Sequence, residues 1–453
     1  MSHRLVFSIV VGPIVSVCLF SQGTQPYPNA ITNRLFYAKT PMAPPAVNTA
    51  FKDPDLGATM LRITDGNTYS KKPNDYFLNP TSDVNEWSSD NSKFYVAAGH
   101  TGANLAFAFN PAAMSISALR GAGVDGALIV PLRAGPTFSF LDPDLMYGTT
   151  LKAPLMIATY RFSTGQVIPL FDTQTCGTQP PLAAGPKQSS TDSTISGDDN
   201  RIMISAGGGS AGHYAFVVVY DQKLGCRWYN TQTGQIGGQW GPTGQASIPD
   251  TFSVNHSKIS GNGRYARIGV AKIGFYVWDI ATLNVQVCRL KSGLHCGGYG
   301  AVGYDSYFNA PGVLDELNTF VRPLGQVASL TQLANPLPQP YYYGMETTWG
   351  WTNGVLKGSV PVCGTTYSPV GNPDVRQPFD GEVVCIETDG VAQTIWRFAH
   401  NRTVWDPEYF WTQPFGNISS DGRFFSFTSS WDGQVGTFGE GDPRTDVWMV
   451  SLD

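Results

Sequence analysis

The stretch Ile418-Ser419-Ser420-Asp421-Gly422-Arg423, followed by the apolar run Phe424-Phe425-Ser426-Phe427, occurs in four versions along the chain. Each of the other three versions also precedes a short β-rich run. They are Trp87-Ser88-Ser89-Asp90, Ile195-Ser196-Gly197-Asp198 and Ile259-Ser260-Gly261-Asn262. An internal repeat of this kind indicates an architecture built from several similar units.

Each unit has the pattern of a strand, a tight turn and a second strand. The pairs Asn262-Gly263 and Asp421-Gly422 suit hairpin turns, because glycine tolerates positive φ and the Asx side chain bonds nearby backbone. A further apolar run follows, such as 275–280, which predicts three or four antiparallel strands per unit. One small sheet cannot bury both of its faces, so the units must stack against one another.

The spacing of the repeats predicts the number of units. The repeat serines Ser88, Ser196, Ser260 and Ser419 are 108, 64 and 159 residues apart, and a period of roughly 50–60 residues divides these gaps into about two, one and three units. Degenerate copies fit the gaps at 137–171, 297–330 and 346–398. We expect an all-β fold, a single β-propeller of about seven four-stranded blades over residues 51–453.

The segment Thr59–Thr64 is expected to complete the last blade as its outer strand and so to close the ring. Rings of six or eight blades are the nearest alternatives. A parallel β-helix would have shorter repeats without hairpin turns, and a pair of β-sandwiches would not reuse one turn motif at near-regular intervals. The composition agrees with a turn-dense all-β protein, since 453 residues include 50 Gly and 32 Pro and only 14% are charged.

The N-terminus has the pattern of an export signal. Arg4 precedes an apolar stretch that ends at Phe20, and small residues at 21 and 23 suit cleavage after Gly23. An uncleaved anchor and a lipid attached to Cys18 are the alternatives. We therefore expect a signal peptide (1–23), an extended leader (24–50), no later membrane-spanning segment, and a secreted, periplasmic or cell-surface protein.

Removal of the signal leaves six cysteines, and an even number in an exported chain predicts disulfides. Proximity in sequence suggests the pairs Cys288–Cys296, Cys363–Cys385 and Cys176–Cys226, out of fifteen connectivities. The net charge is −5, or −6 after loss of Arg4, from 29 − 1 = 28 basic and 34 acidic residues. Without a basic cluster, nucleic acid is not an expected partner.

No catalytic signature is present: the chain has no Gly-x-Ser-x-Gly elbow, no Walker-type lysine loop and no His-Glu-x-x-His. The five histidines after residue 23 lack close metal-ligand spacing, so no metal site is predicted, and the sequence leaves the question of a cofactor open. A metal site would have to be assembled from different blades. Propellers place function on the face where the innermost strands begin, and residues before the repeats should line that face. The expected binding residues are Asp83, Asn85, Asp192, Asn255, His400, Trp349 and Trp411.

His256 is the strongest single candidate for chemistry, because histidine can act as base, acid or ligand near neutral pH. If the protein is an enzyme, we expect His256, Arg402 and Glu346 to form its catalytic group, with Arg402 pairing with a substrate carboxylate. A histidine bonded between strands and an internal Arg–Asp pair are the structural alternatives. The loop 405–411 contains four aromatic residues, and long loops on a rigid scaffold often carry binding. A second aromatic cluster, at 341–351, could form a carbohydrate platform, with plain strand core as the alternative.

The repeat Ile-Ser-x-Asp/Asn-Gly-Arg followed by an apolar strand resembles the TolB-like (WD40-like, PD40) propeller repeat, most closely at 259–265 and 418–424. The family pattern usually has proline after the serine, where this chain has serine or glycine. The resemblance implies a propeller and does not choose a function. The opening 53–65 and the last blade are similar to the oligogalacturonate lyase-like branch, whose histidine cluster does not align onto this chain.

Three functions follow from these features. The first is an exported propeller that binds a polysaccharide or a protein partner through its channel face without chemistry. The second is a polysaccharide lyase or hydrolase that acts on acidic sugars. The third is a surface or assembly subunit.

Overall fold

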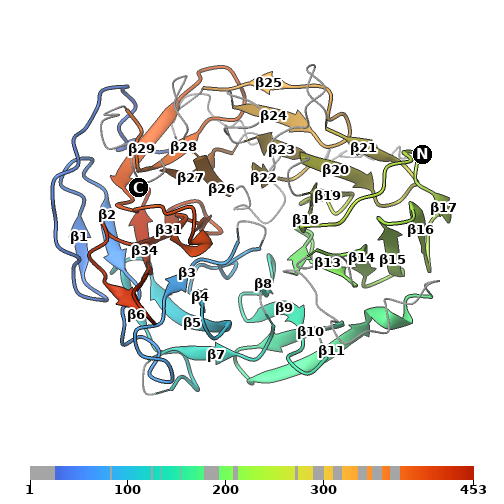
Figure 1. Cartoon of the computed structure of the whole chain (residues 1–453), viewed down its shortest axis with the longest axis horizontal. Helices are drawn as coiled ribbons and strands as arrows, with labels where there is room; N and C mark the ends of the chain where they lie inside the picture. Colours follow the sequence, from blue (N-terminus) through green and yellow to red (C-terminus); the bar gives the residue numbers. More distant parts are fainter. Residues whose placement is uncertain are drawn as a thin grey trace, which may run out of the picture.

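The computed structural model describes residues 26–81, 84–123, 126–133, 135–153, 155–177, 193–207, 213–270, 274–288, 300–309, 319–334, 344–348, 360–367 and 378–453, the backbone alone for 344–348. Two short 3₁₀ helices, η1 (Thr173–Thr175) and η2 (Phe410–Thr412), are the helical elements of this part of the chain. All other elements are strands, and they form a wheel of small antiparallel sheets around one axis (Figure 1). The described residues thus form the expected all-β propeller.

Seven sheets form the blades, numbered here in chain order. Blade 1 contains β3 (Phe77–Leu78), β4 (Lys93–Ala98), β5 (Ala103–Asn110), β6 (Ser115–Ser117) and β7 (Leu128–Val130). Blade 2 contains β8 (Thr137–Phe138), β9 (Leu145–Thr149), β10 (Met156–Arg161) and β11 (Gln166–Asp172). Blade 3 contains β12 (Thr194–Ile195), β13 (Arg201–Ala206), β14 (Phe216–Asp221), β15 (Gly225–Asn230), β16 (Gln235–Gly238) and β17 (Gly244–Gln245).

The next three blades have four strands each. Blade 4 contains β18 (His256–Ile259), β19 (Tyr265–Val270), β20 (Gly274–Asp279) and β21 (Val285–Val287). Blade 5 contains β22 (Gly300–Val302), β23 (Ser306–Asn309), β24 (Phe320–Pro323) and β25 (Thr331–Gln332). Blade 6 contains β26 (Gly344–Thr348), β27 (Val362–Tyr367), β28 (Glu382–Ile386) and β29 (Ile395–His400). The degenerate copies expected from the repeat spacing correspond to blades 2, 5 and 6.

Blade 7 joins the two ends of the chain. It contains β30 (Gly416–Ile418), β31 (Phe424–Ser429) and β34 (Asp446–Ser451) from the C-terminal end, then β2 (Thr59–Arg62) and β1 (Ala50–Lys52) from the N-terminal end. Strand β2 pairs antiparallel with β34, with Met60 opposite Val450. The prediction that 59–64 supplies the closing strand is confirmed, and β1 adds a further outer strand. A small hairpin, β32 (Thr437–Phe438) and β33 (Asp442–Pro443), projects between β31 and β34.

The repeat motif forms the turn between the first two strands of a blade. In blade 7, the Ser419 hydroxyl donates to Asp421 Oδ1 (2.7 Å) and accepts from the Phe424 backbone N–H (3.0 Å). In blade 4, Ser260 bonds Asn262 and the Tyr265 N–H in the same way, at 2.7 and 2.9 Å. Gly263 and Gly422 have φ of +69° and +76°, as these turns require.

The same turns tie neighbouring blades together. The Ser420 N–H of blade 7 donates to Asn91 Oδ1 of blade 1 (2.7 Å), and the Gly197 N–H of blade 3 donates to the Gly261 carbonyl of blade 4 (2.8 Å). Apolar clusters fill the joints between the blades. The joint of blades 7 and 1 holds Phe424, Trp87 and Phe94, among others. The repeat therefore supplies both the hairpin turn and the contact surface that stacks the units.

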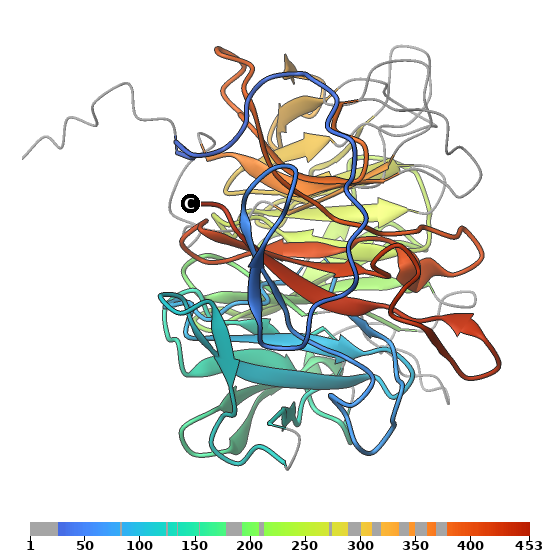
Figure 2. The ribbon, with the colours of Figure 1, turned by 90° about the vertical axis from the view of Figure 1, so that its left-hand side faces the viewer.

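The leader crosses the outer edges of three blades as an extended segment. Ile31 forms an antiparallel bridge with Arg397 in blade 6, and Tyr27 packs edge-on against Trp396 and Phe398. Further along, Asn48 accepts a hydrogen bond from the Ile116 N–H of blade 1 (2.7 Å). Figure 2 shows this blue segment running over the outer edge of the wheel. The expected signal peptide lies outside the described residues.

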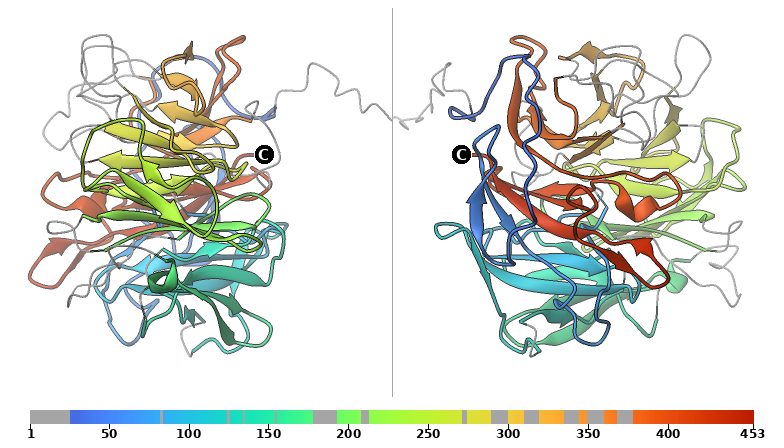
Figure 3. Two further views of the ribbon diagram at one scale, coloured as in Figure 1. Left: turned by 90° about the vertical axis from the view of Figure 1, so that its right-hand side faces the viewer. Right: turned by 60° about the vertical axis from the view of Figure 1, so that its left-hand side comes forward.

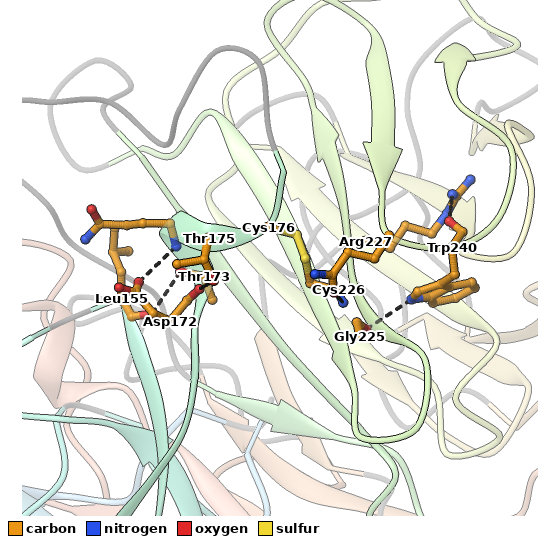
Figure 4. Close-up of a disulfide and its surroundings, with 11 residues drawn as sticks. Leu155, Asp172, Thr173, Thr175, Cys176, Gly225, Cys226, Arg227 and Trp240 are labelled. Atoms are coloured by element: carbon orange, nitrogen blue, oxygen red, sulfur yellow. Dashed lines mark hydrogen bonds between the residues drawn. A yellow bond between two sulfur atoms is a disulfide. The ribbon is translucent and has the colours of Figure 1, made fainter.

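Two of the expected disulfides are present. Cys363 and Cys385 are cross-strand partners in blade 6. Cys176, after η1 of blade 2, is bonded to Cys226 in β15 of blade 3 (Figure 4). Cys288 is disulfide-bonded as well, but its expected partner Cys296 lies outside the described residues. No helix in the described part of the chain is long and apolar enough to cross a membrane.

Candidate functional site

Three loops of blades 7 and 1 project from one face of the wheel. Loop 63–76 leads from β2 into β3, loop 401–415 leads from β29 into β30, and loop 430–445 connects β31 to β34. In an antiparallel blade these connections emerge at the same end of the sheet. Figures 2 and 3 show the red loops of blade 7 extending from this side. We call this side the loop-rich face.

The three loops meet in an aromatic cluster of Tyr76, Tyr409, Trp411 and Phe438, all half-buried. Tyr76 stacks on Trp411 with ring centroids 4.9 Å apart and planes 27° apart, and it lies 4.6 Å from the Phe438 ring. The Tyr409 ring centroid is 5.1 Å from that of Trp411. Half-buried rings fixed by one another keep part of their surface in contact with solvent, which is the arrangement of a binding platform.

The backbone beneath the cluster is held by specific hydrogen bonds. The indole Nε1 of Trp411 donates to the Pro443 carbonyl (3.0 Å), which joins loop 401–415 to the β32–β33 hairpin. The Thr412 hydroxyl accepts from the Asp406 N–H (2.9 Å) and so closes the loop on itself. Gly99 has no room for a side chain, because an added Cβ would lie 1.8 Å from the Tyr76 ring. The rings are therefore positioned before any ligand binds.

Acidic groups surround the cluster. Asp75 Oδ1 accepts from the Tyr76 and His100 N–H groups, at 2.9 and 3.1 Å, and burial raises the pKa of this carboxyl above its usual value. Burial also raises the pKa of Tyr76. The nearby Asp442 carboxylate raises the pKa of the Tyr409 hydroxyl by repulsion and by a hydrogen bond. Hydroxyl groups that keep their protons can donate to the oxygens of a polar ligand.

His256 lies in β18, the innermost strand of blade 4. The Arg267 guanidinium donates to its Nε2, and its Nδ1 is 3.3 Å from the Asn255 amide. Arg267 is buried, and its Nη2 donates to the Tyr307 hydroxyl of blade 5 (3.3 Å). His256 and Asn255 therefore belong to a hydrogen-bonded group between blades 4 and 5. This agrees with a histidine bonded between strands, which was the alternative to a catalytic role for His256.

His400 and Arg402 lie at the outer rim between blades 6 and 7. His400 is the last residue of β29 and is buried. Arg402 is buried too, with Nη1 3.2 Å from Asp432 Oδ2 and the guanidinium over the Trp431 ring. Arg402 thus forms an internal Arg–Asp pair, which was the alternative to its pairing with a substrate carboxylate. Because His256 is on an innermost strand and Arg402 follows an outermost one, the two side chains do not share a site.

The remaining sequence candidates divide into two groups. Asn85 links blades 1 and 2, since its Nδ2 donates to the Phe138 carbonyl (3.2 Å) and its N–H donates to Thr137 Oγ1 (2.9 Å). Glu346 is in β26, of which the structure describes the backbone alone. Three candidates lie outside the described residues: Asp83, Asp192 and Trp349.

Of the expected binding residues, Trp411 is the one found in the aromatic cluster. Sequence reasoning identified its loop from the density of aromatic residues, but it did not identify Tyr76 or Phe438. Each of these is a single aromatic residue in a polar stretch, 70–76 or 436–443. A search for lone aromatics in the loops that flank the closing blade would have found both.

No protein-family model matches the sequence, and no curated protein matches it. Among solved structures, the chain is similar to oligogalacturonate lyase from Vibrio parahaemolyticus, at 9% identity and a TM-score of 0.49, over 94% of this chain and 99% of that one. Oligogalacturonate lyase in complex with manganese gives 10% identity and a TM-score of 0.48, over 94% and 98%. The Neurospora crassa Pan2 WD40 domain gives 10% and 0.45, over 85% and 91%. The propeller architecture that the repeat implied is confirmed by the seven blade sheets of the structure itself.

Proposed function

We propose that the protein is an exported propeller that binds a neutral polysaccharide at the aromatic cluster of its loop-rich face, without catalysis. The observation that carries this proposal is the set of half-buried rings of Tyr76, Trp411 and Phe438, which contact one another and come from three separate loops. Sugar rings present apolar C–H faces that stack on such aromatics, while their hydroxyls need polar partners at the rim.

The charges near the cluster favour a neutral sugar over an acidic one. Glu408 and Glu440 are exposed on the two loops that supply Tyr409, Trp411 and Phe438, and Asp442 bonds Tyr409. A uronic-acid polymer would bring further negative charge to this acidic surface, and like charges disfavour binding. The two exposed lysines of the neighbouring loop, Lys71 and Lys72, offer a partial balance.

Export is part of the proposal. Two disulfides join strands or blades in the described part of the chain, and such bonds persist in oxidising compartments. The apolar N-terminal stretch that ends at Phe20 agrees with a signal peptide. The lyase alternative would use His256 together with Arg402, and those residues lie in different blades and at different radial positions.

Affinity electrophoresis through gels that contain soluble polysaccharides tests the binding proposal. We expect the protein to be retarded in gels with a neutral β-glucan, mannan or xylan and to migrate freely with polygalacturonate. The same mixtures are followed by ultraviolet absorbance for unsaturated products, which we expect to be absent. Free migration in every neutral gel would overturn the proposal, and product formation from polygalacturonate would favour the lyase alternative.

A further inference from the structure

Three side chains with metal-ligating atoms converge at the outer rim between blades 6 and 7. Asp53 and Asp55 belong to the turn between β1 and β2 of blade 7, and His400 ends β29 of blade 6. One carboxylate oxygen from each aspartate and one ring nitrogen of the histidine all lie within 4.8 Å of one another. None of these three residues belongs to the aromatic cluster, and His400 is buried.

The imidazole of His400 is 2% exposed and makes one clear hydrogen bond. Its Nε2 is 3.2 Å from the Tyr37 carbonyl oxygen of the leader. Since a carbonyl oxygen can only accept, this nitrogen carries the proton, and in the neutral ring Nδ1 then presents a lone pair. Nδ1 is buried without a hydrogen-bond partner. It lies 3.2 Å from Asp55 Oδ2 and 4.0 Å from Asp53 Oδ2.

A lone pair that faces two carboxylate oxygens in a buried place is electrostatically unfavourable unless positive charge lies between them. The cations nearby are largely engaged elsewhere. Arg402 pairs with Asp432 at 3.2 Å and is 4.0 Å from Asp55, and Lys39 also pairs with Asp432. The carboxylates of Asp53, Asp55 and Asp432 carry three negative charges. Arg402 and Lys39 carry two positive charges, so one negative charge is left beside the neutral imidazole.

We propose that His400 Nδ1 and one carboxylate oxygen each from Asp53 and Asp55 bind a divalent transition-metal ion of the zinc type. One imidazole with two carboxylates is a ligand set that suits zinc better than calcium or magnesium, which prefer oxygen ligands alone. The 3.2 Å separation of Nδ1 and Asp55 Oδ2 is compatible with metal–ligand bonds of about 2.0–2.2 Å.

The bound ion fastens the leader to the wheel. Thr40 donates to Asp55 through both its backbone N–H (2.9 Å) and its hydroxyl (2.5 Å), and Tyr37 accepts from His400. The ion would therefore connect blade 6, the β1–β2 turn of blade 7 and the leader at one point. A buried metal with this ligand set has a structural effect, since ion binding to the folded state alone stabilises that state.

The test uses the mature protein, dialysed against a chelator and then titrated with zinc chloride alone. We expect about one zinc ion per chain by elemental analysis and a rise in the thermal midpoint that a chelator reverses. The variant Asp55→Asn, and independently His400→Gln, should lose both effects. His100→Gln, at an exposed histidine of another loop, is the matched control and should retain both.

Circular dichroism of each metal-free variant shows whether it is folded. Asp55→Asn decides the question if His400→Gln does not fold, because asparagine keeps the size of the Asp55 side chain and position 55 lies in the turn between β1 and β2. An anomalous zinc peak between His400 and the two aspartates in wild-type crystals would support the proposal directly. Absence of stoichiometric zinc, or binding that Asp55→Asn leaves unchanged, would overturn it. A wild-type thermal midpoint that does not respond to zinc would also overturn it.

Discussion

The Ser426 hydroxyl donates a hydrogen bond to Glu86 Oε1 at 2.7 Å, across the joint between the last and the first blade. Asn79 Nδ2 donates to the other carboxylate oxygen at 2.8 Å. Glu86 is fully buried, and none of the groups acting on its pKa in the described part of the chain is basic. The place where the ring closes therefore contains a carboxyl group that is bonded but not charge-balanced.

Stability should depend on pH through Glu86. Burial raises the pKa of this carboxyl to about 8, against 4.5 in the unfolded chain, although hydrogen bonds from Asn79, Ser426 and Asn417 oppose the rise. Between these two values the folded state binds more protons than the unfolded state. The free energy of unfolding therefore falls as pH rises from about 4.5 to about 8, by at most about 1.4 kcal/mol per pH unit.

The variant Glu86→Gln removes this titration and keeps the size of the side chain. We expect it to gain stability relative to wild type as the pH of urea unfolding is raised from 5 to 8. Burial raises the pKa of Asp446 to about 6, against the opposing effects of Arg444 and Arg62, but this contribution is common to both proteins and cancels in the difference. A difference that does not change with pH would show that Glu86 is ionised in the folded protein throughout this range.

Loss of one repeat serine should weaken its blade. Ser419→Ala removes the hydroxyl that donates to Asp421 and that accepts from the Phe424 N–H, and it leaves buried polar groups without that partner. We expect a loss of about 1–3 kcal/mol in the free energy of unfolding, measured by denaturant titration. Ser329→Ala, at an exposed serine outside the repeat, is the control and should stay within about 0.5 kcal/mol of wild type. Equal effects of the two substitutions would mean that the repeat turn is not a stabilising device.

Truncation of Tyr27 tests whether the leader is part of the folded structure. Tyr27 is 3% exposed, and its hydroxyl donates to the Gly422 carbonyl in the repeat turn of blade 7 (3.2 Å). Tyr27→Ala should cost about 3–5 kcal/mol, as for other buried aromatic residues. Phe36→Ala changes a leader aromatic that is 41% exposed, and we expect a loss below about 1 kcal/mol. A leader that is merely tethered would make the two substitutions equivalent in thermal or denaturant unfolding.

Features carried by the repeat could be predicted from sequence, because each copy repeats the same local physics. Ser260, Asn262 and Gly263 specify a turn wherever such a group recurs, and the spacing between the copies predicted about seven blades. The closing strand was predicted from the β-rich character of 59–64 and its position before the first blade. The contacts of the leader were not predictable in this way. Tyr27 packs against Trp396, a partner distant in sequence, and nothing local to residue 27 specifies that partner.

The site was predicted in part for the same reason. Trp411 belongs to a loop whose aromatic content is visible in the sequence, whereas Tyr76 reaches it only because the ring closes and brings loop 63–76 beside loop 401–415. His256 and Arg402 were grouped by their chemistry alone. Their separation follows from radial position, since one is on the innermost strand of its blade and the other follows an outermost strand.

The most direct measurement of the central claim is the polysaccharide affinity of Trp411→Ala compared with that of Trp240→Ala. Both tryptophans are half-buried, and both donate Nε1 to a backbone carbonyl, Pro443 for Trp411 (3.0 Å) and Gly225 for Trp240 (3.1 Å), so the two changes are matched. We predict that Trp411→Ala weakens binding of the neutral polysaccharide about ten-fold or more, equivalent to about 1.4 kcal/mol, and that Trp240→Ala leaves it unchanged. Equal affinities of the two variants, with both folded, would contradict the account.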